Sequence, residues 1–188
     1  LTMKLVEPTE QAPLSGVVRR PTLRELYENH LRQVWRFCRR MGVAEADLDD
    51  ACQEVFLIAH RKLPEFEGRS SPLVWLLGIS VRVAAARRRR VQNTREVPSE
   101  GLPEPAGPEV ASSGLERSEA RVLLDRMLEG LDEAKRAVFV LYELEELSMP
   151  EISELLGCPL QTAYSRLHAA RRQLEAAIAS RLAREEVP

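Results

Sequence analysis

The chain has 188 residues, of which 44% are hydrophobic and 30% are charged, and its formal net charge is −2. This composition is typical of a soluble globular protein, and no apolar run approaches the roughly 20 residues that a membrane-spanning helix needs. We therefore expect no membrane insertion. A protein that binds DNA unaided is usually strongly basic, and this chain is not.

The charge is unevenly distributed. Residues 1–90 contain 16 Lys and Arg against 11 Asp and Glu, whereas residues 91–188 contain 11 against 18. Residues 1–20 mix Pro, Glu, Thr and Gly and lack the apolar core of a signal peptide. We expect this segment to be flexible and the protein to be cytoplasmic.

Three cysteines, Cys38, Cys52 and Cys158, are widely separated in the sequence. An odd, scattered set does not indicate a disulfide framework. Each lies among apolar helical positions, where a free Cys is usually a small buried hydrophobe. No His or Cys pair has the short spacing of zinc ligands, so we expect neither a metal site nor a cofactor.

Two helices are predicted first along the chain, at residues 23–41 and at about 45–63. The first ends at Gly42, and the second opens with carboxylates that suit a helix N-terminus. The core stripe of the second helix is predicted to contain Leu48, Ala51, Val55, Ile58 and Ala59. Beside this stripe lie Asp50, Gln53, Glu54 and Leu57. They form either an ordinary solvated face or a surface that docks on a basic partner.

A loop at residues 64–72 follows, with Phe66 as its anchor, and a third helix begins at about Leu73. This helix ends in Arg82 and Arg87 to Arg90. Arginines at a helix C-terminus complement the helix dipole, but five in nine residues exceed that need. We interpret them as a surface that follows phosphates.

Residues 92–118 are rich in Pro, Glu, Ser and Gly and contain no aromatic residue. Such a segment cannot bury enough apolar surface to become ordered, so it is predicted to be a flexible linker. An amphipathic helix at 120–131 follows. Asp132 then caps another helix that carries Ala137, Val138, Leu141 and Tyr142.

Residues 148–175 are predicted to form two helices separated by a turn. Gly157 ends the first helix and Pro159 prevents its continuation. The second helix is expected to bury Ala163, Leu167, Ala170 and Leu174. Its opposite face carries Gln161, Ser165, His168 and Arg172, with Arg166 and Arg171 at the flanks. This pattern indicates either an ordinary helical hairpin or a helix-turn-helix whose second helix enters the major groove.

These segments together resemble the extracytoplasmic-function sigma factors of bacterial RNA polymerase. The resemblance lies in DLDDACQEVFLIAHRKLPEFEG and WLLGI in the first half, and in LDEAKRAVFVLYELEELSMPEISELLGCPLQTAYSRLHAARRQL in the second. It implies an all-α fold. A region 2 domain of three or four helices (21–91) would be joined by the linker (92–118) to a helix-turn-helix region 4 domain (119–180), followed by a tail (181–188).

The resemblance also implies partners and site residues. The helix with Asp49, Asp50, Gln53, Glu54 and Leu57 would dock on the clamp coiled coil of the largest polymerase subunit. The −10 element and its displaced strand would meet Phe66, Arg69, Ser70, Ser71, Trp75, Arg82, Arg87, Arg88, Arg89 and Arg90. The −35 element would meet Gln161, Thr162, Tyr164, Ser165, Arg166, His168, Arg171 and Arg172. An anti-sigma factor is a further expected partner. Arg82 and Ala86 depart from the family, which commonly has Asn and Asp at these places.

The sequence also has features that two other classes of function could use. A stand-alone dimeric helix-turn-helix regulator would need a spare apolar helix face, and none is evident. An enzyme could use the acidic cluster of Asp47, Asp49, Asp50 and Glu54. However, no ligand-spaced His or Cys, Gly-rich phosphate loop or nucleophile elbow accompanies this cluster. We therefore expect a promoter-binding initiation factor with no enzymatic activity and no small-molecule substrate.

Overall fold

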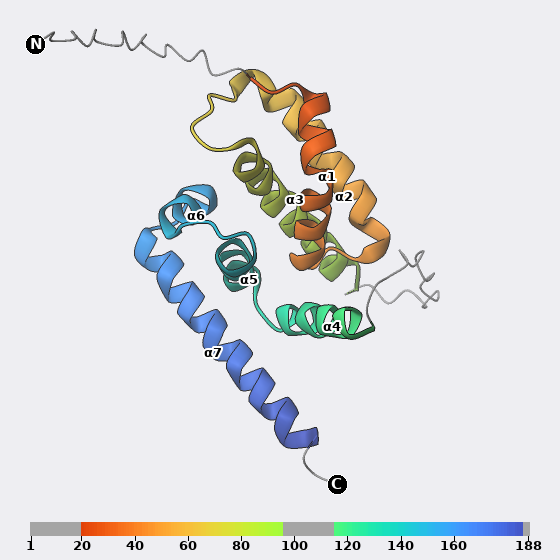
Figure 1. Cartoon of the computed structure of the whole chain (residues 1–188), viewed down its shortest axis with the longest axis vertical. Coiled ribbons are helices and arrows are strands. Elements are labelled where there is room, and N and C mark those ends of the chain that lie inside the picture. Colours follow the sequence, from red (N-terminus) through yellow and green to blue (C-terminus); the bar gives the residue numbers. More distant parts are fainter. Residues whose placement is uncertain (1–19, 96–114, 186–188) are drawn as a thin grey trace, which may run out of the picture.

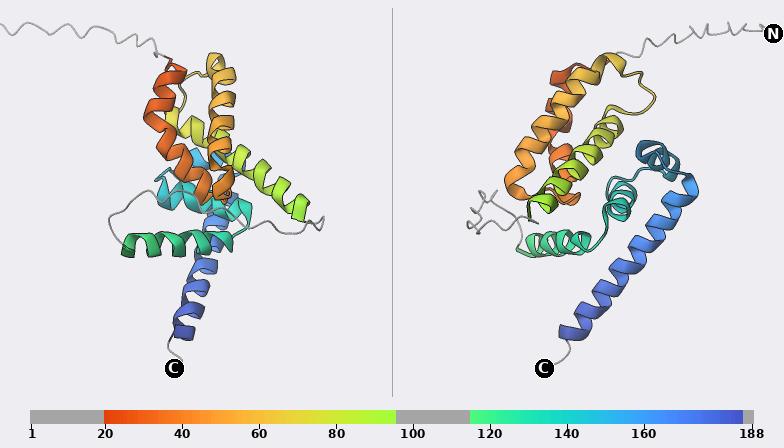
Figure 2. Two further views of the ribbon diagram at one scale, coloured as in Figure 1. Left: turned by 90° about the vertical axis from the view of Figure 1, so that its right-hand side faces the viewer. Right: turned by 180° about the vertical axis from the view of Figure 1, so that it is seen from behind.

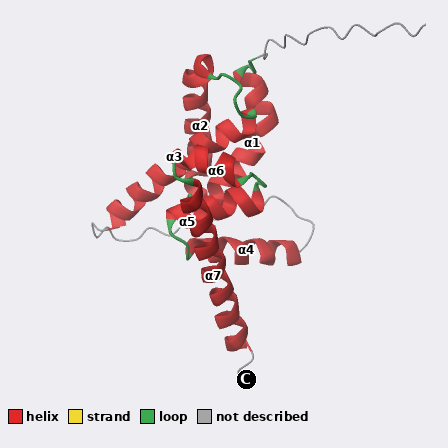
Figure 3. Ribbon diagram, turned by 90° about the vertical axis from the view of Figure 1, so that its left-hand side faces the viewer, coloured by secondary structure: helices red, strands yellow, loops and turns green. Residues whose placement is uncertain are grey.

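The computed structural model describes residues 20–95 and 115–185. The predicted flexible N-terminal segment (except Arg20), the central part of the predicted linker and the last three residues lie outside this range. Within the described residues every regular element is helical and there is no strand (Figure 3), which confirms the all-α prediction. No helix in these residues is long and apolar enough to cross a membrane.

The first part of the fold is a bundle of three helices, called here the N-terminal bundle. It consists of α1 (Leu23–Arg40), α2 (Leu48–Lys62) and α3 (Pro72–Arg95), which pack against one another (Figure 1). Short 3₁₀ turns, η1 (Glu45–Asp47) and η2 (Leu63–Glu65), flank α2. The predicted core stripe of α2 is largely confirmed: Leu48, Ala51, Val55 and Ala59 are buried, together with Cys52 and Phe56, and Ile58 is half-buried.

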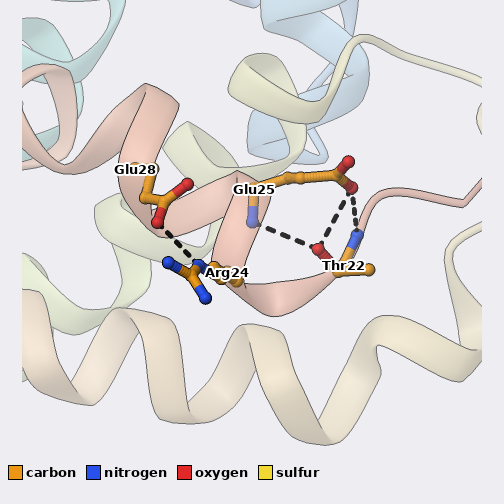
Figure 4. Close-up of polar contacts among 4 residues, drawn as sticks. All are labelled: Thr22, Arg24, Glu25 and Glu28. Atoms are coloured by element: carbon orange, nitrogen blue, oxygen red, sulfur yellow. Dashed lines mark hydrogen bonds and ion pairs between the residues drawn. The ribbon is translucent and has the colours of Figure 1, made fainter.

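A capping box defines the start of α1 (Figure 4). The Thr22 hydroxyl accepts a hydrogen bond from the Glu25 amide at 3.2 Å, and the Glu25 carboxylate accepts one from the Thr22 amide at 2.8 Å. These bonds satisfy amide groups that a helix start otherwise leaves without partners. An exposed ion pair between Arg24 and Glu28 supports the first turns. At the other end, Gly42 adopts the left-handed φ of 84° that ends the helix.

The second part of the fold, called here the C-terminal unit, begins with α4 (Leu115–Glu129) and α5 (Glu133–Phe139). A π-helical turn, η3 (Val140–Leu144), follows, and then α6 (Met149–Leu156) and the long α7 (Leu160–Glu185). As predicted, Asp132 caps α5, because its carboxylate accepts a hydrogen bond from the Lys135 amide at 2.9 Å. The C-terminal half of α7 projects away from the rest of the molecule (Figures 1 and 2).

The structure differs from the sequence interpretation at both ends of the linker. Helix α3 continues to Arg95, and α4 already starts at Leu115. No Pro or Gly interrupts the chain between Val91 and Val97, so nothing in the sequence stops α3 at residue 91. Gly114 immediately precedes the start of α4.

The two parts of the fold pack against each other. Their buried apolar side chains form one continuous cluster, and α4 lies against α1 while α6 lies against α3. Polar contacts also join them. Arg39 pairs with Asp125 at 2.9 Å, Arg40 pairs with Glu145 at 2.8 Å, and Arg136 donates a hydrogen bond to the Met41 carbonyl at 3.1 Å. The sequence suggested two separate domains and gave no sign of these contacts.

The turn between α6 and α7 depends on Gly157, whose φ is 62°. Replacing Gly157 with Ala is expected to lower the free energy of unfolding by about 1 kcal/mol, because a Cβ atom disfavours this left-handed conformation. A Cβ there would meet nothing within 4 Å, so the loss comes from the backbone alone. Urea denaturation measures it, and Gly157→Asn should lose less, since Asn tolerates this conformation better. An equal loss in both variants would contradict this explanation.

Candidate nucleic-acid and partner interfaces

The helix-turn-helix is formed by α6 and α7. Ser148 and Glu151 form a capping box at the start of α6, a signal that the sequence contained and that our interpretation did not use. The left-handed Gly157 then sets the direction in which the chain enters α7. The predicted inner stripe of α7 is confirmed, because the following four side chains are all at least 93% buried: Ala163, Leu167, Ala170 and Leu174.

The opposite face of α7 is open to solvent. Gln161, Ser165, His168 and Arg172 are exposed, and Tyr164 is 41% exposed. Thr162 and Arg166 are half-buried at the edges of this face. The Ser165 hydroxyl donates a hydrogen bond to the Thr162 carbonyl at 2.9 Å, within the helix. The arrangement presents hydrogen-bonding groups on a rigid helix of the width that the major groove of DNA admits.

Arg171 is placed differently from the other residues predicted to meet the −35 element. Its guanidinium contacts the Glu143 carboxylate at 2.6 and 2.7 Å and lies 5.5 Å from the centre of the Tyr142 ring. Both partners belong to η3. Arg171 therefore holds α7 against the rest of the C-terminal unit, an internal role that the sequence did not reveal.

Arg171→Ala is expected to lower the free energy of unfolding by about 1 kcal/mol, because it removes a partly exposed ion pair and a cation–π contact. A thermal unfolding experiment measures this loss. Arg172→Ala is the matched control, since Arg172 is exposed on the same helix. If the two variants unfolded at the same temperature, the structural role of Arg171 would be excluded.

The predicted docking face of α2 is exposed. Asp49, Asp50 and Gln53 are open to solvent, and Leu57 is 55% exposed. Glu54 is the exception, because its carboxylate accepts hydrogen bonds from Arg87 at 2.9 and 3.2 Å. Two residues that the sequence assigned to different partners thus bind each other and join α2 to α3.

The loop before α3 combines buried and exposed side chains. Phe66 is only 6% exposed and packs on Trp75, with ring centres 5.0 Å apart. The Ser71 hydroxyl accepts a hydrogen bond from the Val74 amide at 3.2 Å and so caps α3. In this arrangement Phe66 and Ser71 support the loop. Arg69 is exposed near them and pairs with Glu67.

The basic end of α3 is only partly open to solvent. Arg82, Arg89 and Arg90 are exposed, whereas Arg87 and Arg88 are half-buried. Ala86, at the second position that departs from the family, is also half-buried.

Arg136 is a buried charged residue that the sequence interpretation missed. It lies on α5, is 1% exposed, and its Nε atom has no hydrogen-bond partner. Burial, with a further contribution from the nearby positive charge of Arg88, lowers the pKa of Arg136 to about 10. The side chain therefore stays charged at neutral pH. The local sequence offers no signal that separates Arg136 from an ordinary exposed arginine, because its hydrogen-bond partner Met41 lies on a distant part of the chain.

The three cysteines are free. Cys38 and Cys52 are buried as predicted, and Cys158 is half-buried. A hydrogen bond with Cys52, together with burial, raises the pKa of the Cys38 thiol. Within residues 20–95 and 115–185, no cluster of three or more His, Cys, Asp or Glu side chains could hold a metal ion.

Comparisons with known proteins agree with this geometry. The family model for sigma-70 region 2 matches residues 26–94, and the one for sigma-70 region 4 matches residues 121–174. The ECF RNA polymerase sigma-E factor of Escherichia coli (strain K12) is 32% identical over 145 residues, which cover 71% of this chain and 74% of that protein. The factor of the same name from Haemophilus influenzae is 31% identical over 147 residues, covering 71% and 75%.

Two solved structures share the fold. CnrH, in complex with the cytosolic domain of CnrY, matches with a TM-score of 0.63 and 22% identity over 84% of this chain and 88% of its own. The sigma factor RpoE, in complex with the anti-sigma factor NepR from Bartonella quintana, matches with a TM-score of 0.65 and 20% identity over 83% and 96%. Given its two matching regions and its relatives, this chain belongs to the ECF sigma factors of RNA polymerase.

Proposed function

We propose that this sigma factor divides promoter recognition between its two parts. Residues 21–91 would bind the polymerase core and the −10 element, and residues 119–180 would bind the −35 element. Residues 92–118 would connect them along the RNA exit path. The observation that carries the proposal is the helix-turn-helix, whose α7 buries its inner stripe and exposes a polar face bordered by arginines.

The polymerase contact is assigned to the exposed face of α2. Asp50 and Gln53 present an acidic and polar surface, and Leu57 adds an exposed apolar side chain one turn after Gln53. Such a surface complements a basic partner helix, here the clamp coiled coil. It also explains how a chain with a net charge of −2 can reach DNA, because the polymerase supplies much of the attraction to phosphates.

The −35 contact is assigned to α7. Tyr164, Ser165 and His168 are placed to reach base edges, and Arg172 to reach a phosphate. Gln161 and Thr162, in its first turn, lie where the amide groups of a helix N-terminus favour a phosphate. Arg166 borders the same face.

The −10 contact is assigned to α3 and the loop before it. Arg69, Ser70, Arg82, Arg89 and Arg90 line a basic, largely exposed path for a displaced single strand, and Trp75 offers a half-buried ring. Holding that strand favours an open promoter without any chemistry by this protein.

An anti-sigma factor is the expected inhibitor, since both related structures described above contain a bound partner, named as an anti-sigma factor in one of them. Such a partner would cover the polymerase-binding or promoter-binding faces. As a polymerase subunit, the protein is assigned to the cytoplasm, and the function requires no enzymatic step or cofactor.

Run-off transcription from a promoter library tests the proposal, with core polymerase in the presence and absence of this protein. Initiation only when both are present is expected, and the enriched sequences would then define the −35 and −10 preferences. Specific duplex binding by the protein alone, without initiation, would instead support a stand-alone dimeric helix-turn-helix regulator.

A further inference from the structure

Two of the three cysteines meet in the core of the N-terminal bundle. Cys38 lies on α1 and Cys52 on α2, and these helices pack against each other. Their side chains are 0% and 3% exposed, and the two thiols are hydrogen-bonded to each other. The end of α1 and the turn η1 separate them in the sequence, so the packing of the bundle makes them neighbours.

A third helix completes the surroundings of this thiol pair. Ser80 of α3 is fully buried, and its hydroxyl donates a hydrogen bond to the Leu76 carbonyl at 2.8 Å and also contacts the Cys38 thiol. Within the part of the chain that the structure describes, no third His, Cys, Asp or Glu side chain joins the pair in a potential metal cluster. Two thiols alone do not complete the four ligands of a structural zinc site. The pair is therefore a dithiol.

The two thiols differ in how readily they ionise. The hydrogen bond with Cys38 lowers the pKa of the Cys52 thiol, and the positive charge of Arg87 acts in the same direction. Burial and the charge of Asp49 oppose this lowering of the pKa. The same hydrogen bond, together with burial, raises the pKa of Cys38. Cys38 thus keeps its proton, and Cys52 is the better nucleophile because the thiolate is the reactive form of cysteine.

The pair lies on the inner side of α2, whose outer side is assigned above to the polymerase. Cys52 directly precedes Gln53 in the chain, but Cys52 is buried whereas Gln53 is exposed. Asp50 and Leu57, the other side chains of the docking face, are exposed as well. A bond between the two thiols would therefore join α1 to α2 without occupying that face.

We propose that Cys38 and Cys52 are a modification site, a dithiol that hydrogen peroxide converts to a reversible disulfide, and that this disulfide staples α1 to α2 behind the polymerase-docking face. The site goes beyond the proposed function, on which only its relation to the polymerase rests. A disulfide needs its sulfurs about 2 Å apart, so thiols in hydrogen-bond contact have a short distance to close. The crosslink should stabilise the bundle because it restricts the unfolded chain.

The oxidation takes two steps. In the first, the Cys52 thiolate attacks a peroxide oxygen, an S–O bond forms, the O–O bond breaks, and the departing hydroxide takes up the proton that Cys52 released. In the second, the Cys38 sulfur attacks the sulfenic sulfur of Cys52, an S–S bond forms, the S–O bond breaks, and the departing hydroxide takes the Cys38 proton. Two thiols and one hydrogen peroxide thus give one disulfide and two waters. A thiol reductant reverses the change by exchange.

Mass spectrometry of the full chain tests the disulfide. The background is Cys158→Ser, which removes the third thiol of the sequence and so prevents crosslinks through it. After treatment with hydrogen peroxide, the protein is expected to lose the mass of two hydrogen atoms. The tryptic peptides that contain Cys38 and Cys52 should then stay joined until dithiothreitol is added. If both thiols still reacted with N-ethylmaleimide after peroxide treatment and denaturation, the proposal would be overturned.

Single replacements in the same background are the matched controls. Cys38→Ala cannot form the bond, so the peroxide should leave a sulfenic acid on Cys52, which dimedone captures. Cys52→Ala should react at least about tenfold more slowly, because Cys38 is fully buried. Circular dichroism checks that both variants remain helical. Equal labelling of the two variants would overturn the assignment of Cys52 as the attacking thiol.

Thermal unfolding and polymerase binding test the staple. The oxidised Cys158→Ser protein is expected to unfold about 6–12 °C above its reduced form, because a short closed loop lowers the entropy of the unfolded chain. Its affinity for core polymerase should change by less than about twofold, since the exposed face of α2 is unaltered. An unfolding temperature that did not rise, or a loss of affinity of about tenfold, would overturn the staple. Absence of polymerase binding by the reduced protein would count against the proposed function, whereas the mass and unfolding results would still decide the disulfide.

Discussion

Replacing Asp50 and Gln53 together with Arg is expected to weaken binding to core RNA polymerase by about 100-fold, because the variant opposes a basic partner surface with like charges. Both side chains are exposed and make no contact that the fold requires. The far-ultraviolet circular dichroism and thermal unfolding of the variant should therefore match those of the original chain. Fluorescence anisotropy of the labelled sigma factor, titrated with core polymerase, measures the affinity.

Glu54 is left unchanged in this variant because it pairs with Arg87. Its replacement would disturb the packing of α2 on α3 and confuse a folding defect with a binding defect. The control is Glu175→Arg with Ser180→Arg, two exposed positions on α7 whose substitution alters the net charge by the same amount. If the control lost as much affinity as the α2 variant, net charge rather than the α2 face would govern binding.

Replacing Tyr164 and His168 together with Ala is expected to weaken binding of the holoenzyme to its preferred −35 element by about 10- to 100-fold, since a good base contact contributes about 1–3 kcal/mol of discrimination. Binding to a promoter with a scrambled −35 element should change little. Competition binding with the two promoters measures the ratio. A uniform loss on both would show that these side chains contact the DNA backbone.

Arg172→Ala is the informative comparison for this experiment. It should weaken binding to both promoters about equally, because phosphates carry no sequence information. It should also reduce the slope of log affinity against log salt concentration by the contribution of about one phosphate contact. Arg171 is not suited to this comparison. Its guanidinium is bound to Glu143 and Tyr142, so its removal would alter the position of α7 itself.

The contrast between Arg171 and Arg172 shows where sequence patterns stop being informative. Both residues were predicted to lie on or beside the outer face of α7, and helical periodicity treats them alike. The structure separates them because η3, which precedes α6 in the chain, folds back beside α7 and offers Glu143 to one of them. In the same way, the Glu54 carboxylate of α2 accepts a hydrogen bond from Arg87 of α3. Such pairings depend on elements that the local sequence does not bring together.

The sequence by itself determined the helices, their caps and the inner stripe of the recognition helix. These features depend on short-range spacing: Leu167 lies four residues after Ala163, and Gly157 ends α6 wherever the rest of the chain lies. The tertiary structure alone decided which charged side chains remain exposed and how the two parts of the fold meet. Arg136 is the clearest case, because its burial requires Met41 and Gly42, which lie about 95 residues earlier in the chain. No pattern within α5 carries that information.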